Sequence, residues 1–208
     1  MASRELALGS SDAFAGQAEA ERGLLEMCRR GDAEAFARLV RLHESMVYNL
    51  SARLLGDGEE ARDLSQDVFL QVYRTLGGFQ ERSTLKTWIY RIVVNQARNR
   101  QRFWRRRRRE RCCPIEDMTA ADHARASAVH PDPEAPFERL ARGEQALQIQ
   151  AALRKLSFDH RAILLLREVE ELDCDEIASA LSVPQGPVKS RLARARDALR
   201  AAVAEVAR

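Results

Sequence analysis

The chain has 208 residues, of which 45% are hydrophobic, 31% charged and only 6% aromatic. This length fits one large or two small domains, and the abundance of Ala, Leu, Arg and Glu favours an all-helical protein. No apolar run approaches the roughly 18 residues of a membrane span, and residues 1–19 resemble neither a signal nor a transit peptide. We therefore expect a cytoplasmic protein without membrane insertion.

Helical spacing of apolar residues begins at residue 23, after an aperiodic stretch, 1–22, that we expect to be a flexible arm. The pattern predicts four helices, at about 23–31, 32–55, 59–76 and from 84 onward. Asp32 is predicted to cap the second of these, and the glycines of 56–58 to end it. We interpret 23–111 as one small helical domain.

The segment 112–137 interrupts this periodicity. It contains four prolines and no sustained apolar pattern, which predicts a flexible linker. A second helical block of about 70 residues follows, enough for a small and marginal bundle. The predicted fold is all-α, with two small helical domains, 23–111 and 138–208, joined by the linker, and a helix-turn-helix in the second.

Charge is distributed unevenly, although the net charge is only +3. Residues 91–111 contain ten Arg and one Glu, and residues 185–208 contain six Lys or Arg and two acids. The linker between them carries five acids and one Arg. Two basic segments separated by an acidic one predict two contacts with a polyanion, although a charge run can also be a solvated face.

The most specific local pattern is that of a helix-turn-helix over 173–201. A short helix ends at Leu181, Val183 supplies an apolar plug inside the turn, and a basic helix begins near Pro187, which suits a first helical position. A basic helix of this width fits the major groove of duplex DNA. The duplex-binding candidates are Gln185, Lys189, Ser190, Arg191, Arg194 and Arg196. A plain helical hairpin with a solvated basic face is the competing interpretation.

Aromatic, amide and Arg side chains alternate in the first basic segment. Arg binds phosphate, aromatic rings stack on unpaired bases, and Asn can hydrogen-bond a base edge, so the mixture suits single-stranded or opened DNA. The candidates are Phe79, Trp88, Tyr90, Arg91, Asn95, Arg98, Asn99, Arg102, Phe103 and Trp104. Trp88 can equally be a core residue, whereas Phe79 follows two glycines in a loop, where core packing is harder to explain.

Three stretches taken together resemble a known family. They are ARDLSQDVFLQVYRTL at 61–76, STLKTWIYRIVVN at 83–95 and DEIASALSVPQGPVKSRL at 175–192. In this order and spacing they resemble bacterial sigma factors of the extracytoplasmic-function group, over roughly residues 23–206. The resemblance implies an alternative sigma factor that binds core RNA polymerase and directs initiation at promoters with −10 and −35 elements.

The resemblance also implies roles for particular residues. The helix 61–76 would present Asp63, Gln66 and Asp67 to the coiled-coil clamp of the largest polymerase subunits. The segment 79–99 would recognise and open the −10 element, and the helix-turn-helix would bind the −35 element as duplex. The implied pocket for a flipped base consists of Phe79, Ser83, Thr84 and Asn95. An anti-sigma factor is a further implied partner.

The physical chemistry of these segments agrees with the implied roles. Extracting a base costs a few kcal/mol, and stacking returns roughly 1–3 kcal/mol per base, so opening is nearly balanced and requires no ATP if polymerase contacts hold the complex. The linker reaches roughly 85 Å when extended, against ~70 Å for the two helical turns between the elements. By its charge, the acidic linker would avoid DNA.

The sequence departs from the family pattern in two places. Family members usually carry Thr at the position of Pro187, so a phosphate or cap contact is expected to be absent there. The Arg run at 105–109 is denser than the pattern requires. A grip on upstream DNA and a helix extended into solvent are both open interpretations of this run.

Two other classes of function compete with a sigma factor. A regulator that only mimics the architecture would bind polymerase without directing initiation. A zinc enzyme could be imagined on Cys112, Cys113, His123 and His130, but their spacing matches no common zinc site. No catalytic constellation stands out, so we expect no enzymatic activity, no cofactor and no metal. Cys28, with the adjacent pair at 112–113, could be redox-sensitive, although inert thiols are commoner.

Overall fold

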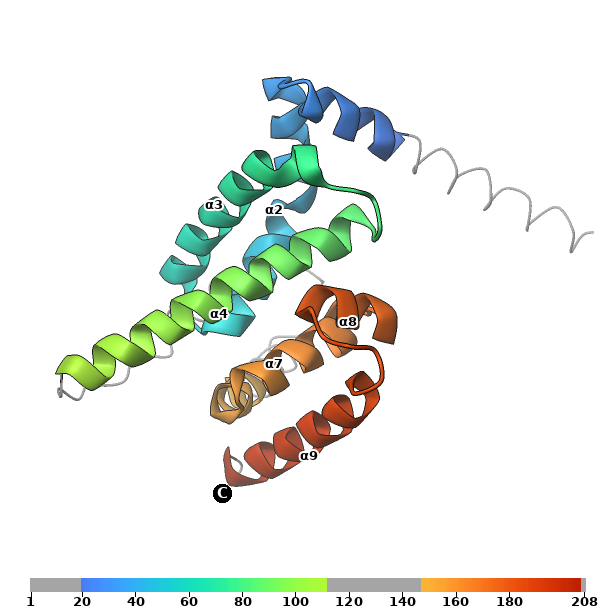
Figure 1. Cartoon of the computed structure of the whole chain (residues 1–208). Coiled ribbons are helices and arrows are strands. Elements are labelled where there is room, and N and C mark those ends of the chain that lie inside the picture. The colour runs from blue at the N-terminus through green and yellow to red at the C-terminus, as the bar shows by residue number, and fades with distance from the viewer. Residues whose placement is uncertain (1–19, 112–146, 207–208) are drawn as a thin grey trace, which may run out of the picture.

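The computed structural model describes residues 20–111 and 147–206, and within these ranges every regular element is a helix (Figure 1). This confirms the predicted all-α class and its two helical domains. The predicted linker, with Cys112, Cys113, His123 and His130, lies outside the described residues. No helix in the described part of the chain is long and apolar enough to cross a membrane.

The N-terminal domain begins with a helix over 20–29, three residues earlier than predicted. It continues with α2 (Ala33–Leu55), α3 (Gly58–Thr75), the short 3-10 helix η1 (Leu76–Gly78) and α4 (Leu85–Arg111). Local chemistry sets these boundaries: the Asp32 carboxylate accepts the N–H groups of the first turn of α2, and Asp57 does the same for α3. Between them Gly56 ends α2 in the left-handed conformation, at φ 75°.

Helices α2, α3 and α4 pack around one apolar core. The apolar side of α3 is buried at Ala61, Leu64, Val68 and Val72, and Leu76 just after the helix is buried as well. The apolar side of α4 is buried as well, at Leu85, Trp88, Ile89, Ile92, Val93 and Ala97. Helix α4 begins where the Thr84 hydroxyl accepts the backbone N–H of Thr87, 3.1 Å away. It continues through the Arg run, in which Arg106 and Arg107 are exposed.

The C-terminal domain consists of a helix over 147–155, α7 (Phe158–Leu164), the π-helical turn η2 (Leu165–Val169), α8 (Cys174–Leu181) and α9 (Val188–Val206). A capping box starts α8, because Asp173 accepts backbone N–H groups of the first turn while Glu176 accepts the N–H of Asp173. Ser182 ends α8 in the left-handed conformation, at φ 55°. The chain therefore reverses direction within a short turn before α9.

The two domains pack directly against each other. Helix α8 lies against α4, and α7 approaches α2 (Figure 1). Buried residues of both domains belong to one continuous hydrophobic cluster. The side chains on the C-terminal-domain side of α4 are therefore in a different environment from those on its outer side.

Candidate nucleic-acid and polymerase interfaces

The second helix of the helix-turn-helix presents one buried and one basic face. Val188, Leu192 and Ala195 of α9 are buried, and Val183 in the turn is half-buried against the same core, as its predicted role as a plug requires. All six duplex-binding candidates are exposed: Gln185, Lys189, Ser190, Arg191, Arg194 and Arg196. The fold thus places these six side chains together on the outside of one helix and the turn before it.

One of the basic side chains on α9 is held by a carboxylate of its own domain. Nε and Nη2 of Arg196 both donate to Oε1 of Glu168, at 2.9 and 2.6 Å. Glu168 lies in η2, and both side chains are about half exposed. This contact fixes the orientation of the Arg196 guanidinium on the exposed basic face of α9.

The candidates for opened DNA divide between two sides of α4. An exposed stripe contains Arg91, Asn95, Asn99 and Arg102, with Thr84 just before the helix. Their spacing of three or four residues places them on one face. Tyr90 is fully buried, and Arg98 is half-buried on the side of the C-terminal domain. The sequence did not separate these two groups, because both have a helical spacing.

Phe79 and Trp88 pack against each other, with ring centroids 5.0 Å apart, and both belong to the core cluster. Phe79 is 7% exposed and Trp88 8%. This explains the large apolar residue in the loop, which the sequence alone did not. The loop is held to the first helix, because Arg29 donates to the Phe79 carbonyl at 2.7 Å and pairs with Glu81 at 3.1 Å. A role of Phe79 in a base pocket stays a prediction, as do those of Ser83, Thr84 and Asn95.

Tyr90 faces the C-terminal domain, and its hydroxyl donates to Glu170. Burial, followed by this carboxylate, raises the pKa of Tyr90 far above its ordinary value. The hydroxyl is therefore a donor at any physiological pH. In this arrangement Tyr90 is engaged within the protein.

The exposed face of α3 contains the three polymerase-docking candidates, Asp63, Gln66 and Asp67. Two large apolar side chains extend the same face: Leu70 is 53% exposed and Tyr73 57%. The sequence did not single out either residue as exposed. Leu70 lies three residues after Asp67 and four after Gln66, and Tyr73 lies three residues after Leu70. This helical spacing was the available signal.

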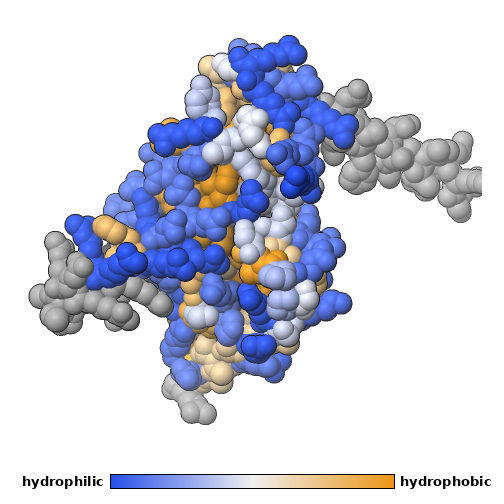
Figure 2. Space-filling view, in the orientation of Figure 1, coloured by the Kyte–Doolittle hydropathy of each residue, from blue (hydrophilic) through white to orange (hydrophobic). Residues whose placement is uncertain are grey.

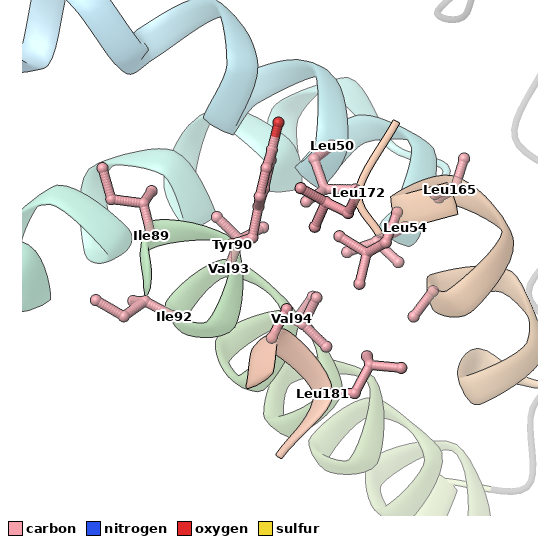
Figure 3. Packing of buried hydrophobic residues seen from close by; sticks show 14 of the residues in the cluster. Leu50, Leu54, Ile89, Tyr90, Ile92, Val93, Val94, Leu165, Leu172 and Leu181 are labelled. Atoms are coloured by element: carbon pink, nitrogen blue, oxygen red, sulfur yellow. The ribbon is translucent and has the colours of Figure 1, made fainter. Parts of the chain in front are cut away.

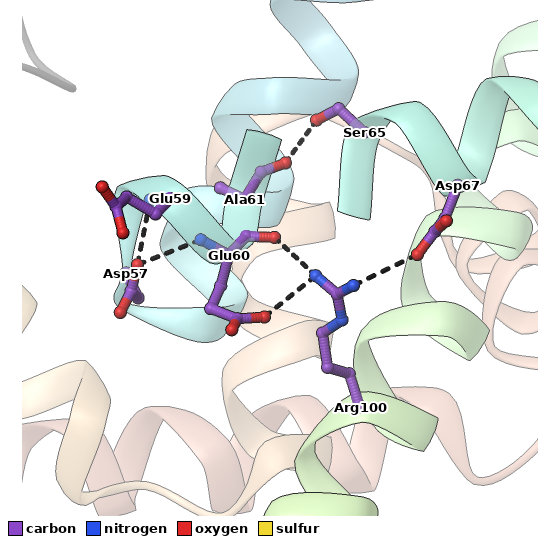
Figure 4. Close-up of polar contacts among 7 residues, drawn as sticks. All are labelled: Asp57, Glu59, Glu60, Ala61, Ser65, Asp67 and Arg100. Atoms are coloured by element: carbon purple, nitrogen blue, oxygen red, sulfur yellow. Dashed lines mark hydrogen bonds and ion pairs between the residues drawn. The ribbon is translucent and has the colours of Figure 1, made fainter. Parts of the chain in front are cut away.

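Arg100 of α4 connects this face of α3 to α4 (Figure 4). Its Nη1 donates to the Glu60 carbonyl and contacts Oε2 of the same residue, both at 2.9 Å, and its Nη2 lies 3.1 Å from Oδ2 of Asp67. Burial raises the pKa of Glu60, while Arg100 opposes the shift. Asp67 is consequently held in one orientation on the exposed side of α3.

Within the described ranges, no group of three or more His, Cys, Asp or Glu side chains could hold a metal ion. Burial and the neighbouring Asp32 raise the pKa of the Cys28 thiol, which favours its unreactive protonated form. In the space-filling view, hydrophilic residues cover most of the visible face around smaller hydrophobic patches (Figure 2).

The comparisons with known proteins agree with this arrangement. The Sigma-70 region 2 family matches residues 39–110, and the Sigma-70 region 4 family matches residues 146–199. The RNA polymerase sigma-H factor of Pseudomonas aeruginosa is 36% identical, over 87% of this chain and 92% of its own length. The ECF RNA polymerase sigma-E factor of Escherichia coli is 34% identical over 85% and 90%, and SigW of Bacillus subtilis 30% over 85% and 92%.

Two solved structures share the fold. The sigma factor RpoE of Bartonella quintana, in complex with the anti-sigma factor NepR, superposes with a TM-score of 0.63 at 22% identity, covering 82% of this chain and 98% of that one. CnrH, in complex with the cytosolic domain of CnrY, gives 0.59 at 24% identity, covering 86% and 94%.

The two matched regions and the helix-turn-helix define a promoter-recognition factor of the sigma-70 class. The chain belongs to the extracytoplasmic-function family of RNA polymerase sigma factors. It is an alternative sigma factor that directs promoter-specific transcription initiation.

Proposed function

We propose that residues 23–111 dock on core RNA polymerase and recognise and open the −10 element, while residues 138–208 recognise the −35 element. The observation that carries this division is the separation of the exposed candidates onto two helices. One set is the α4 stripe, and the other is the outer face of α9 with its preceding turn. Each helix buries its opposite side, so the exposed candidates of each helix can approach DNA without local unfolding.

On the −35 side, the first turns of α9 enter the major groove of intact duplex. Lys189 and Arg191 contact base edges or the nearest phosphates, while Arg194 and Arg196 hold phosphate. Support comes from the exposure of all four side chains. Phosphate would replace the carboxylate of Glu168 on the guanidinium of Arg196. Ser190 and Gln185 flank this set and add neutral hydrogen-bonding groups.

On the −10 side, Arg91 and Arg102 bind phosphates at the two ends of the exposed stripe, and Asn95 and Asn99 between them hydrogen-bond unpaired bases. Thr84 lies before the first turn and is exposed. Trp88 and Phe79 line the inner side of this region and supply stacking surface. Flipping a base costs a few kcal/mol, and stacking on a ring returns roughly 1–3 kcal/mol, so contact with these rings would nearly balance opening.

Docking on polymerase uses the exposed face of α3. Asp63, Gln66 and Asp67 provide carboxylate and amide groups, and Leu70 with Tyr73 provides apolar area beside them. Aromatic side chains surrounded by polar groups are typical of the energetically important centre of an interface.

We assign no enzymatic activity to this chain. Because it acts on the chromosome, we expect it in the cytoplasm.

An anti-sigma factor is a second partner under this proposal. The fold is shared with two sigma factors that were solved in complex with such a protein or with a cytosolic domain. The expected result of adding the cognate anti-sigma factor is loss of transcription that excess sigma factor restores.

In vitro transcription with purified core polymerase and a library of genomic fragments tests the proposal. The wild-type chain should produce discrete start sites, whereas a regulator that only mimics the architecture would bind polymerase and produce none. Asn95→Ala should reduce permanganate reactivity at −10 with little change in −35 protection, and Lys189→Ala should do the reverse. The matched controls are Arg41→Ala on α2 and Arg200→Ala on α9, which are exposed and lie outside both candidate sets.

A further inference from the structure

Helix α4 is much longer than the part of it that packs in the core. In its first half, Tyr90 belongs to one apolar cluster with Leu54 of α2 and Leu181 of α8 (Figure 3). Ala97 is the last buried side chain among those that the structure describes in this helix. The helix continues to Arg111, and in Figure 1 this end projects beyond α3. Its side chains are therefore available to a partner.

The exposed stripe of α4 changes its chemistry after Asn99. Up to that residue it contains amide groups, which can hydrogen-bond base edges. The next exposed side chains in the described part of the helix are Arg102, Phe103, Arg106 and Arg107. Arg106 lies four residues after Arg102 and so continues the stripe. Arginines without neighbouring amides favour phosphate, which receives most protein–DNA hydrogen bonds.

The arginines at the end of α4 differ in their contacts from those nearer the core. Arg98 and Arg100 pair with carboxylates of neighbouring helices at 2.9 to 3.1 Å. Among the described residues, no carboxylate pairs with Arg106. The guanidinium of Arg107 lies over the ring of Phe103, 5.1 Å from its centroid. This cation–π contact holds the guanidinium and leaves its N–H donors for an anion.

The arginine run itself requires a counter-charge. Five successive arginines occupy positions 105–109, and no acidic residue occurs between positions 91 and 109. Like charges three or four residues apart destabilise a helix, and long runs of one charge repel each other. A polyanion along this end of α4 would relieve that repulsion, so the charge pattern favours a bound polyanion over a solvated face.

The length of the helix indicates which part of the promoter this end reaches. The eleven residues from Asn95 to Arg106 rise about 16 Å, and each nucleotide of a duplex strand rises about 3.4 Å. Arg106 therefore lies about five base steps from the bases assigned to Asn95. The domain assigned to the −35 element follows α4 in the chain, so this end of α4 faces the spacer, where the DNA is intact duplex.

We propose that the end of α4 binds the phosphate backbone of the duplex directly upstream of the −10 element, through Arg106 and Arg107 and without reading the sequence. Phe103 positions Arg107 with its ring and does not stack on a base. The inference rests on the proposed role of α4 in −10 binding. It adds a third DNA contact, in the spacer, to the two promoter elements.

A salt titration with a matched pair of double variants tests the phosphate contact. Arg106→Ala/Arg107→Ala removes the proposed contact. Arg38→Ala/Arg41→Ala removes two exposed arginines of α2, a helix to which no DNA contact is assigned. Both variants change the net charge equally, so a general attraction to DNA affects both to the same extent. Circular dichroism verifies that each variant retains its helices.

The probe is a fluorescent duplex of mixed sequence, about two helical turns long, titrated by anisotropy against each full-length chain without polymerase. Every chain also carries Lys189→Ala/Arg191→Ala, which weakens duplex binding through α9. Each phosphate contact contributes about 0.9 to the slope of log K against log salt, so the slope of Arg106→Ala/Arg107→Ala should be smaller by about 1.8.

Raising the salt from about 50 to 200 mM should accordingly weaken binding by the α2 control about tenfold more than binding by Arg106→Ala/Arg107→Ala. Arg106→Lys/Arg107→Lys should keep the slope of the control, because a phosphate contact depends on charge. Equal slopes of the two alanine variants would overturn the inference. If these slopes are equal and only the affinity for core polymerase falls, the occupant is an acidic protein surface and the inference is also wrong.

A single strand of the same sequence distinguishes backbone contact from base stacking. Phe103→Ala should lower the affinity for this strand less than fivefold, because the ring already contacts the guanidinium of Arg107. One stacked base provides at least about fivefold. A larger loss would show that Phe103 stacks on unpaired bases and would overturn the assignment to duplex.

Hydroxyl-radical footprinting of the holoenzyme locates the contact on a promoter identified by the in vitro transcription above. Arg106→Ala/Arg107→Ala should lose protection of the backbone directly upstream of −10 and keep the protection at −35. Unchanged protection would overturn the inference. A wild-type chain that directs no start site, but shows the expected difference in salt slopes, would contradict the proposed residue roles and support the phosphate site.

Discussion

Arg161→Ala is the substitution whose effect follows most directly from the structure. The side chain is 4% exposed, and its guanidinium donates to four backbone carbonyls. The acceptors are Leu153, Arg154 and Leu156, at 2.9, 3.1 and 3.3 Å, and Leu54 of the other domain at 2.6 Å. Three of them lie at the C-terminal end of the helix 147–155 or just beyond it, where carbonyls lack partners within the helix.

The loss of stability in Arg161→Ala depends on how many backbone carbonyls remain buried without a hydrogen-bond donor. Each buried acceptor without a partner costs about 1–3 kcal/mol. At least the Leu54 and Leu156 carbonyls take part in hydrogen bonds that are themselves buried. Removing the cation also relieves its own desolvation, which amounts to several kcal/mol for a buried ion. We therefore expect a net loss of about 3–4 kcal/mol in the free energy of unfolding, well below the sum of four charge-assisted hydrogen bonds.

Urea unfolding followed by far-UV circular dichroism measures this loss. Arg154→Ala is the matched control, because its guanidinium also contacts α2, at the Gly56 carbonyl, but across an exposed hydrogen bond. We expect it to cost less than about 1 kcal/mol. Arg161→Lys keeps the charge without the planar fork and should recover less than half of the loss. If Arg161→Ala unfolds within 1 kcal/mol of the control, the reasoning about buried acceptors is wrong.

Three further predictions concern backbone strain, phosphate contact and pH. Gly56→Ala should cost about 1–2 kcal/mol in urea unfolding, because φ is 75° and an added Cβ would lie 3.1 Å from Arg154; Gly77→Ala, with open space around it, should cost less than half as much. Lys189→Ala should lower the slope of log K against log salt for −35 duplex by about 0.9, and an unchanged slope in anisotropy titrations would exclude a phosphate contact. Burial, and next a neighbouring lysine, lower the pKa of His43, so the unfolded chain binds a proton that the native chain does not. Stability should therefore fall as the pH drops below about 6.5, and His43→Gln should remove this part of the pH dependence of the urea midpoint.

The fold could be predicted where local chemistry determines it. Asp32 and Asp57 are capping residues and Gly56 is a helix terminator, and all three do in the structure what their types indicate. The turn before α9 was equally predictable, because Val183 lies between two apolar periods that share one core. The π-helical turn over 165–169 was not, since its apolar residues fit a continuous α-helix equally well.

The sequence predicted the exposed and buried faces of α9 better than those of α4. On α9, the exposed and buried faces follow from helical spacing, because the helix packs mainly against α7 and α8 of its own domain. Helix α4 packs on both domains, and a sequence pattern does not reveal a partner that lies 80 residues away, as Glu170 does from Tyr90. Phe79 illustrates the same limit, since its burial depends on the ring of Trp88 rather than on its loop position.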